Sequence, residues 1–218
     1  MIYIYRKSDM KRFATILILA LAVSMAGAAD LRTLFIEMPD SIMPTLTKSE
    51  RMDFLDYMDS GMRARVRNKL GGESEMTLLE DNMLTVKTSQ SGSLDMVLFK
   101  KKDGKNLICI IRTVTARYAD SRISFYTEEW KPVPLNGMIE LPQFEDYLTK
   151  EALKNDSLDV FRKQSMLRLQ SIAPVGDTLE FSYTSLDYIG EDAERYKSWF
   201  KAEPLRYIWT GKKFKVGK

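Results

Sequence analysis

The stretch from Asn106 to Trp130 shows two different patterns of hydrophobic and polar positions, and we predict that it forms the centre of a sheet. Its first half has apolar residues on both alternating faces, which indicates a strand covered on both sides. These residues are Ile108, Ile110 and Val114 on one face and Leu107, Cys109 and Ile111 on the other. Its second half alternates as a strand with one wet face does. The inward set is Ile123 and Phe125, and the outward set is Arg122, Ser124 and Tyr126.

Two short helices are predicted before this sheet. Apolar residues at positions i, i+3, i+4 and i+7 from Leu31 to Met38 indicate a first helix that ends at Pro39. Thr47 and Glu50 fit a capping box, which predicts that a second helix begins at Lys48. The buried face of this second helix is predicted to contain Met52, Phe54, Leu55, Tyr57 and Met58.

The segment 62–72 carries four basic residues, Arg63, Arg65, Arg67 and Lys69. They are interpreted as a solvated helix or strand end, and the alternative is a contact with an acidic partner. Strands are predicted at 76–79, 83–88 and 94–100. A hairpin turn at Asp103-Gly104 leads into the Asn106 strand, so the prediction is an antiparallel meander that ends near Val133.

A second unit is predicted after the prolines at positions 132, 134 and 142. Its predicted elements are helices near 144–148, 158–161 and 191–201 and strands at 167–172, 179–184, 205–210 and 213–216. Tyr196, Trp199 and Phe200 are expected to be buried if the last helix packs. The fold class is therefore α+β, with helices packed on antiparallel sheet in two tandem helix-helix-plus-sheet units. The predicted units are 29–134 and 135–218, packed as one globular body.

The N-terminus has the pattern of a secretory signal peptide over residues 1–28. A basic pair at Lys11-Arg12 precedes an apolar run that ends at small residues, and cleavage is expected near Ala28 or Ala29. The protein is therefore predicted to be periplasmic or secreted, with no membrane span after cleavage. Four basic residues and one acidic residue lie in this segment, so the mature chain is neutral. A neutral chain lacks the electrostatic footprint of a nucleic-acid binder.

The absence of histidine excludes much enzyme chemistry. Triads that use imidazole as the base are excluded, and the common zinc sites lack their ligands. The single cysteine, Cys109, allows no intramolecular disulfide, and its place in the apolar strand indicates a buried, inert thiol. No phosphate-binding or dinucleotide-binding glycine motif occurs, so no cofactor is predicted. Carboxylates remain, and Asp120, Glu128 and Glu129 are candidates for a glycosidase-like pair.

Several stretches together resemble a known family. They are 38–41, 44–46, 109–114, 120–126 with Trp130, and 207–209. They are similar to an exported bacterial family known as domain of unknown function 3256, and the string Ser-Arg-Ile-Ser-Phe-Tyr at 121–126 is the most specific part. The resemblance implies no established activity and supplies no catalytic residues. The order of elements also resembles beta-lactamase-inhibitor-like modules, an analogy that says little about function.

The leading hypothesis is a non-enzymatic exported module that binds a protein or glycan of the cell envelope through a sheet face. The predicted binding residues are Arg122, Ser124, Tyr126 and Trp130, because Ile123 and Phe125 occupy the inner face of their strand. The alternatives are a hydrolase that uses paired carboxylates on glycans and a structural envelope protein.

Overall fold

The computed structural model describes residues 28–164, 169–186 and 193–217. All but the last residue of the predicted signal peptide lie outside this range. In the described part of the chain, no helix is long and apolar enough to cross a membrane.

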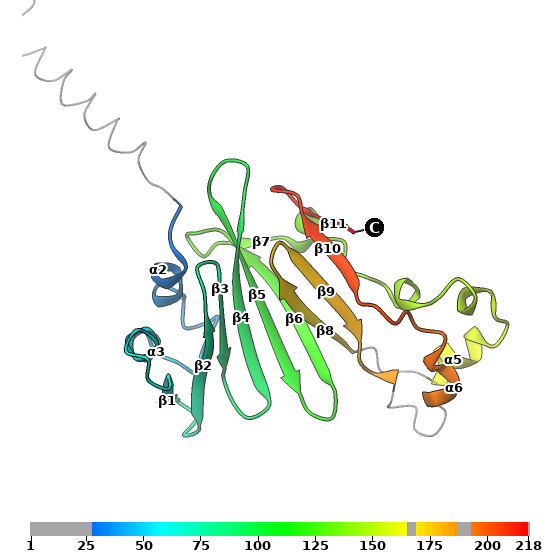
Figure 1. The fold of residues 1–218 in the computed structure, drawn as a ribbon, viewed down its shortest axis with the longest axis horizontal. Coiled ribbons are helices and arrows are strands. Elements are labelled where there is room, and N and C mark those ends of the chain that lie inside the picture. Colours follow the sequence, from blue (N-terminus) through cyan, green and yellow to red (C-terminus); the bar gives the residue numbers. More distant parts are fainter. Residues whose placement is uncertain (1–27, 165–168, 187–192, 218) are drawn as a thin grey trace, which may run out of the picture.

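The first sheet is a seven-stranded antiparallel meander in which each strand pairs with the next along the chain (Figure 1). The strands are β1 (Arg65–Arg67), β2 (Glu73–Leu79), β3 (Met83–Lys87), β4 (Gly92–Lys100), β5 (Asn106–Thr115), β6 (Ala119–Tyr126) and β7 (Pro132–Val133). Gly104, in the β4–β5 turn, has φ of 85°, a backbone conformation that glycine adopts without a side-chain clash. The predicted meander and hairpin are confirmed.

The second sheet is antiparallel with the order β11-β10-β9-β8. Its strands are β8 (Gln170–Val175), β9 (Thr178–Tyr183), β10 (Leu205–Trp209) and β11 (Phe214–Val216). The helices and helical turns are α2 (Leu31–Ile36), α3 (Lys48–Asp59), α4 (Leu135–Met138), η1 (Phe144–Tyr147), η2 (Ala152–Lys154), α5 (Leu158–Gln164) and α6 (Ala193–Lys197). The predicted α+β class with antiparallel sheet is confirmed. The boundary predicted at 134/135 falls between β7 and α4 and stays a prediction.

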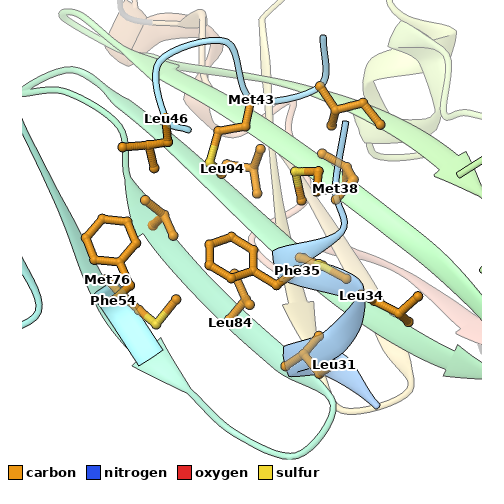
Figure 2. Packing of buried hydrophobic residues seen from close by; sticks show 14 of the residues in the cluster. Leu31, Leu34, Phe35, Met38, Met43, Leu46, Phe54, Met76, Leu84 and Leu94 are labelled. Atoms are coloured by element: carbon orange, nitrogen blue, oxygen red, sulfur yellow. The ribbon is translucent and has the colours of Figure 1, made fainter. Parts of the chain in front are cut away.

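Each face of the seven-stranded sheet has its own core because alternate side chains point to opposite faces. The helix-side core lies between α2, α3, the connecting segment 37–47 and one face of β2–β5 (Figure 2). The sheet–sheet core lies between the other face of β4–β6 and the second sheet. Cys109 is buried in this second core, as predicted. A smaller cluster around Phe161 joins η1, η2, α5 and α6.

Both N-terminal helices begin with side-chain caps, of which the one at α3 was predicted. Asp30 Oδ1 accepts a hydrogen bond from Thr33 N at 2.9 Å, which satisfies one free amide of α2. At α3, Thr47 Oγ1 accepts from Glu50 N at 3.2 Å while Glu50 Oε2 accepts from Thr47 N at 2.6 Å. The predicted capping box is confirmed.

The buried face of α3 contains an arginine where a methionine was predicted. Met52 is 45% exposed, whereas Arg51 is 2% exposed. Arg51 falls three and four positions before Phe54 and Leu55, so it shares their face of the helix. Hydrophobicity alone predicts Met52 here. The structure buries Arg51 because its guanidinium finds partners in the connecting segment.

Those partners are mainly backbone carbonyls of the segment 37–47 and its flank. Arg51 Nη2 donates to Met38 O at 2.6 Å and Ile36 O at 3.1 Å, and Nη1 donates to Leu46 O at 3.1 Å. Nη1 also donates to Asp40 Oδ1 at 3.1 Å. A buried charge is tolerated only when its hydrogen bonds are made, and here the planar fork of arginine makes them.

Other differences from prediction are local. Val114 was placed in a strand covered on both sides, but it is 59% exposed because β5 extends beyond the helix-side core. The helix predicted near 144–148 is a single 3-10 turn, η1. Strand β8 begins at Gln170, and positions 167 and 168 of the predicted strand lie outside the described residues. Helix α6 ends at Lys197, earlier than predicted.

The aromatic residues of the last predicted helix pack as expected. Tyr196 is buried in the cluster around Phe161, and Trp199 and Phe200 pack against that cluster just beyond the end of α6.

We predict that Arg51→Met lowers the free energy of unfolding by about 3 kcal/mol, because several buried carbonyls lose their donor. Urea denaturation of the full chain measures the change. The neighbouring Met52→Ala is the control and should change stability by less than about 0.5 kcal/mol, since Met52 is exposed. Equal effects of the two substitutions would contradict this account of Arg51.

Candidate functional site

The four residues predicted from the sequence lie at the edge of the helix-side face. Arg122, Ser124 and Tyr126 share one face of β6, and Trp130 follows in the turn before β7. The structure brings Tyr126 and Trp130 together, with ring centroids 5.7 Å apart, and packs both against the helix-side core. Arg122 is exposed and Ser124 is half-buried. The aromatic pair is therefore partly used in packing, and a binding role for these residues stays a prediction.

Two polar groups near this edge are enclosed and have no hydrogen-bond partner among the residues that the structure describes. They are Ser124 Oγ and Trp130 Nε1. Trp130 has φ of 59°, unusual for a residue other than glycine, and its backbone N–H donates to Thr127 O at 2.9 Å. The tight turn between β6 and β7 thus directs the indole toward Tyr126.

The opposite face of the seven-stranded sheet carries a continuous line of polar side chains. Strand register places one residue from each of six strands directly beside the next. These residues, called the polar row, are Arg65, Glu75, Lys87, Ser93, Thr113 and Ser121. The row crosses the sheet from the β1 edge to the second sheet, where Ser121 Oγ accepts from Ile172 N at 3.1 Å.

At the β1 edge the row is anchored by arginine–glutamate pairs. Arg63 Nε and Nη2 donate to the two oxygens of Glu75 at 2.7 and 2.9 Å. Arg65 bridges Glu73 at 2.8 Å and Glu75 at 3.2 Å. These hydrogen bonds, that of Arg63 foremost, lower the pKa of Glu75 to about 2. Arg63 and Arg65 of segment 62–72 therefore pair with acids of this same chain.

Asp95 lies next to the row, two positions beyond Ser93 on the same face of β4. Its Oδ1 accepts from Thr85 Oγ1 at 2.6 Å, and within the described residues it has no ion pair. Burial raises the pKa of this carboxyl, and the hydrogen bond from Thr85 opposes that shift. Asp95 is thus a half-buried carboxylate without a counter-ion at the margin of an open surface.

A groove of about 1020 Å³ begins at the β1–β4 part of the row. Its walls include the loop 88–92 between β3 and β4 and the loop 68–72 between β1 and β2. Asn68 fixes the second loop: its Oδ1 accepts from Leu70 N and Gly72 N, and its Nδ2 donates to Ser74 Oγ and Thr88 O. The groove is therefore a preformed, hydroxyl-rich hollow, and the residues described as lining it include no aromatic side chain.

The second hollow, of about 330 Å³, lies beside β10 and includes Asp146, Lys201 and Tyr207. Lys201 Nζ donates to Asp146 O at 2.7 Å, so the ammonium is already engaged. Burial raises the pKa of Tyr207 to about 12, so this phenol is neutral at physiological pH. This hollow has less to offer a charged ligand than the groove.

In the described ranges no group of three acidic, cysteine or histidine side chains is placed to hold a metal ion. The acids Glu73 and Glu75, which line the groove, are held by arginines. The polar row was missed in the sequence because its members lie on six strands and are neighbours only through register.

Comparison with known proteins agrees with the resemblance seen in the sequence. The profile of a family described as "Protein of unknown function (DUF3256)" matches residues 23–214. A search of curated proteins gives no match. One similar solved structure is described as a domain of an uncharacterized protein from Porphyromonas gingivalis W83. It is 27% identical, with a TM-score of 0.76, and the match covers 86% of this chain and 98% of that one.

We predict that Asp95→Asn raises the melting temperature at pH 7. The folded-state pKa of Asp95 is raised, so its ionised form destabilises the fold above the ordinary pKa, and this cost disappears when the carboxyl is protonated. The gain should therefore vanish near pH 3. Thermal melts at both pH values test this, with the exposed Asp81→Asn as the control. A gain in melting temperature that persists at pH 3 would contradict a destabilising charge on Asp95.

For Glu75 the pKa shift has the opposite direction to that of Asp95, so the ionised form stabilises the fold. Its folded-state pKa is lowered from 4.5 to about 2, so it contributes stability above about pH 4.5 that is lost as the pH falls toward 2. Glu75→Gln should therefore reduce stability at pH 6 and have little effect at pH 2. Denaturation at the two pH values measures this, and the exposed Glu80→Gln should show no such difference. An equal loss of stability at both pH values would argue against the pairing of Glu75 with Arg63 and Arg65.

Proposed function

We propose that this chain, which belongs to the DUF3256 family of proteins of unknown function, is a non-enzymatic module that binds a protein or envelope component. The binding surface is the open part of the seven-stranded sheet, formed by the polar row on β1–β4 and the groove beside it. The signal peptide predicted from the sequence supports a location outside the cytoplasm for this activity.

The observation that carries this proposal is that the polar row is continuous across the first sheet, whereas the second sheet covers only part of it. In Figure 1 the second sheet lies on the β6 side of the first sheet, away from β1–β3. Lys87 is exposed, and Glu75 and Ser93 are half-buried. In the described part of the chain Lys87 makes no ion pair, so its ammonium is available to a ligand.

The structure of the row suits recognition by a polypeptide surface. Its fixed arginine–glutamate end keeps both signs of charge in place without rearrangement, which limits the entropy lost on binding. Lys87, Ser93 and Asp95 then offer a cation, a hydroxyl and an anion on two neighbouring strands. Such mixed polar patterns supply specificity and register more than raw affinity.

A hydrolase that uses paired carboxylates is supported less well. General acid and base groups must exchange protons near neutral pH, but Glu75 is held ionised by Arg63 and Arg65. Sugar rings commonly stack on aromatic side chains, and the lining of the groove offers none among its described residues. Both observations favour a binding role and a protein partner.

Capture experiments with a matched pair of arginine substitutions test the proposal. Ser93→Arg places a bulky cation in the row, whereas Asp56→Arg places the same group on the exposed face of α3, on the other side of the sheet. Crosslinking in native envelope extract should recover the same partners with the wild type and Asp56→Arg, and lose them with Ser93→Arg. Circular dichroism melts confirm that both variants fold.

Two results would oppose the proposal. If Ser93→Arg captures the same partners as the wild type, the open face is not the binding surface. If no form of the protein captures a reproducible partner, the binding role itself fails.

A further inference from the structure

The helix-side face carries a second charged feature, separate from the polar row. Arg112 on β5 and Arg122 on β6 are directly opposite each other in the antiparallel register. Side chains of directly opposite residues are close neighbours, and two like charges in such positions repel each other. This pair therefore brings two arginine side chains onto neighbouring strands at the edge of the helix-side core.

Among the described residues, neither arginine forms an ion pair. Arg112 Nη2 donates to Ile42 O at 2.8 Å, a contact that holds the guanidinium in place but leaves its charge uncompensated. Arg122 is exposed, and among the described residues it has no ion pair or hydrogen bond of its side chain. By contrast, Arg63 and Arg65 on the other face are both paired with glutamates.

The surroundings of the pair define the kind of anion that fits. Asp120 shares the same face of β6, two positions before Arg122, and forms no ion pair with either arginine in the described structure. Its negative charge disfavours a dianion such as a phosphate monoester more than a single carboxylate. Val114, two positions after Arg112 on the same face of β5, is 59% exposed and offers an apolar contact beside the charges.

We propose that Arg112 and Arg122 bind a carboxylate of an extended acidic polypeptide segment from another protein. The carboxylate lies between the two guanidinium groups, which suit planar, bidentate recognition of such an anion. An apolar residue two positions along the partner segment contacts Val114, because alternate residues of an extended chain share one face. Ser124 Oγ is enclosed and takes no part.

The probe is a fluorescein-labelled peptide that repeats Ser-Glu-Ser-Val, and its matched counterpart has glutamine in place of glutamate. Fluorescence anisotropy at low salt should show binding of the acidic peptide to the wild-type chain and not of the glutamine peptide. Arg122→Gln should weaken binding by about tenfold, the loss expected when a hydrogen bond to a charged group is removed. Added salt should weaken binding as well.

Arg67→Gln is the matched control, since Arg67 is also an exposed arginine without an ion pair in the described structure but lies on β1. It should bind as the wild type does. Arg112→Lys keeps the charge but loses the planar fork, and it should weaken binding less than Arg122→Gln. Melting curves confirm that the variants fold.

Three outcomes would overturn the proposal. If Arg122→Gln and Arg67→Gln bind the peptide equally, the pair is not the site. If inorganic phosphate competes as well as the acidic peptide, the pair is a site for free anions. If sedimentation shows a dimer that Arg122→Gln abolishes, the surface belongs to a second copy of this chain.

Discussion

The segment that connects α2 and α3 can cover the helix-side face because Arg51 donates hydrogen bonds to its backbone carbonyls. This segment has little regular hydrogen bonding of its own, and burial of its carbonyls without donors would cost several kcal/mol. From α3 the guanidinium reaches Met38 O and Leu46 O in this segment and Ile36 O at the end of α2. Met38, Met43 and Leu46 can then enter the helix-side core, and Ile42 O is placed where it holds Arg112.

Strand pleating divides the polar residues of the central sheet between two surfaces with different properties. The face toward the second sheet carries the polar row, anchored at one end by paired arginines and glutamates and bordered by Asp95. The face toward the helices carries Arg112 and Arg122, opposite each other on β5 and β6. Because the buried centre of the sheet separates them, a ligand on one face need not obstruct a ligand on the other.

Charges in this protein fall into two groups, and the difference bears on function. Glu75 and Arg51 have nearly complete sets of partners, and each contributes to the stability of its region. Within the part of the chain that the structure describes, Asp95 has no ion pair and neither do the opposed arginines on β5 and β6, so each arrangement costs stability. Uncompensated charge at a solvent-accessible position is the pattern expected of a binding surface, since a partner supplies the missing charge.

The sequence by itself determined the features that depend on neighbours along the chain: the α+β class, the capping box of α3, the Asp103-Gly104 hairpin, the meander and the burial of Cys109. Periodicity and turn chemistry act over a few residues, so they can be read locally. The tertiary structure alone decided that Arg51 and not Met52 is buried, that Tyr126 and Trp130 pack on the helix-side core, and that the polar row exists. Each of these features depends on strand register or on which segment covers a face of the sheet. Contacts between residues far apart in the chain decide both, and they set the free-energy cost of burying a charge or exposing an aromatic ring.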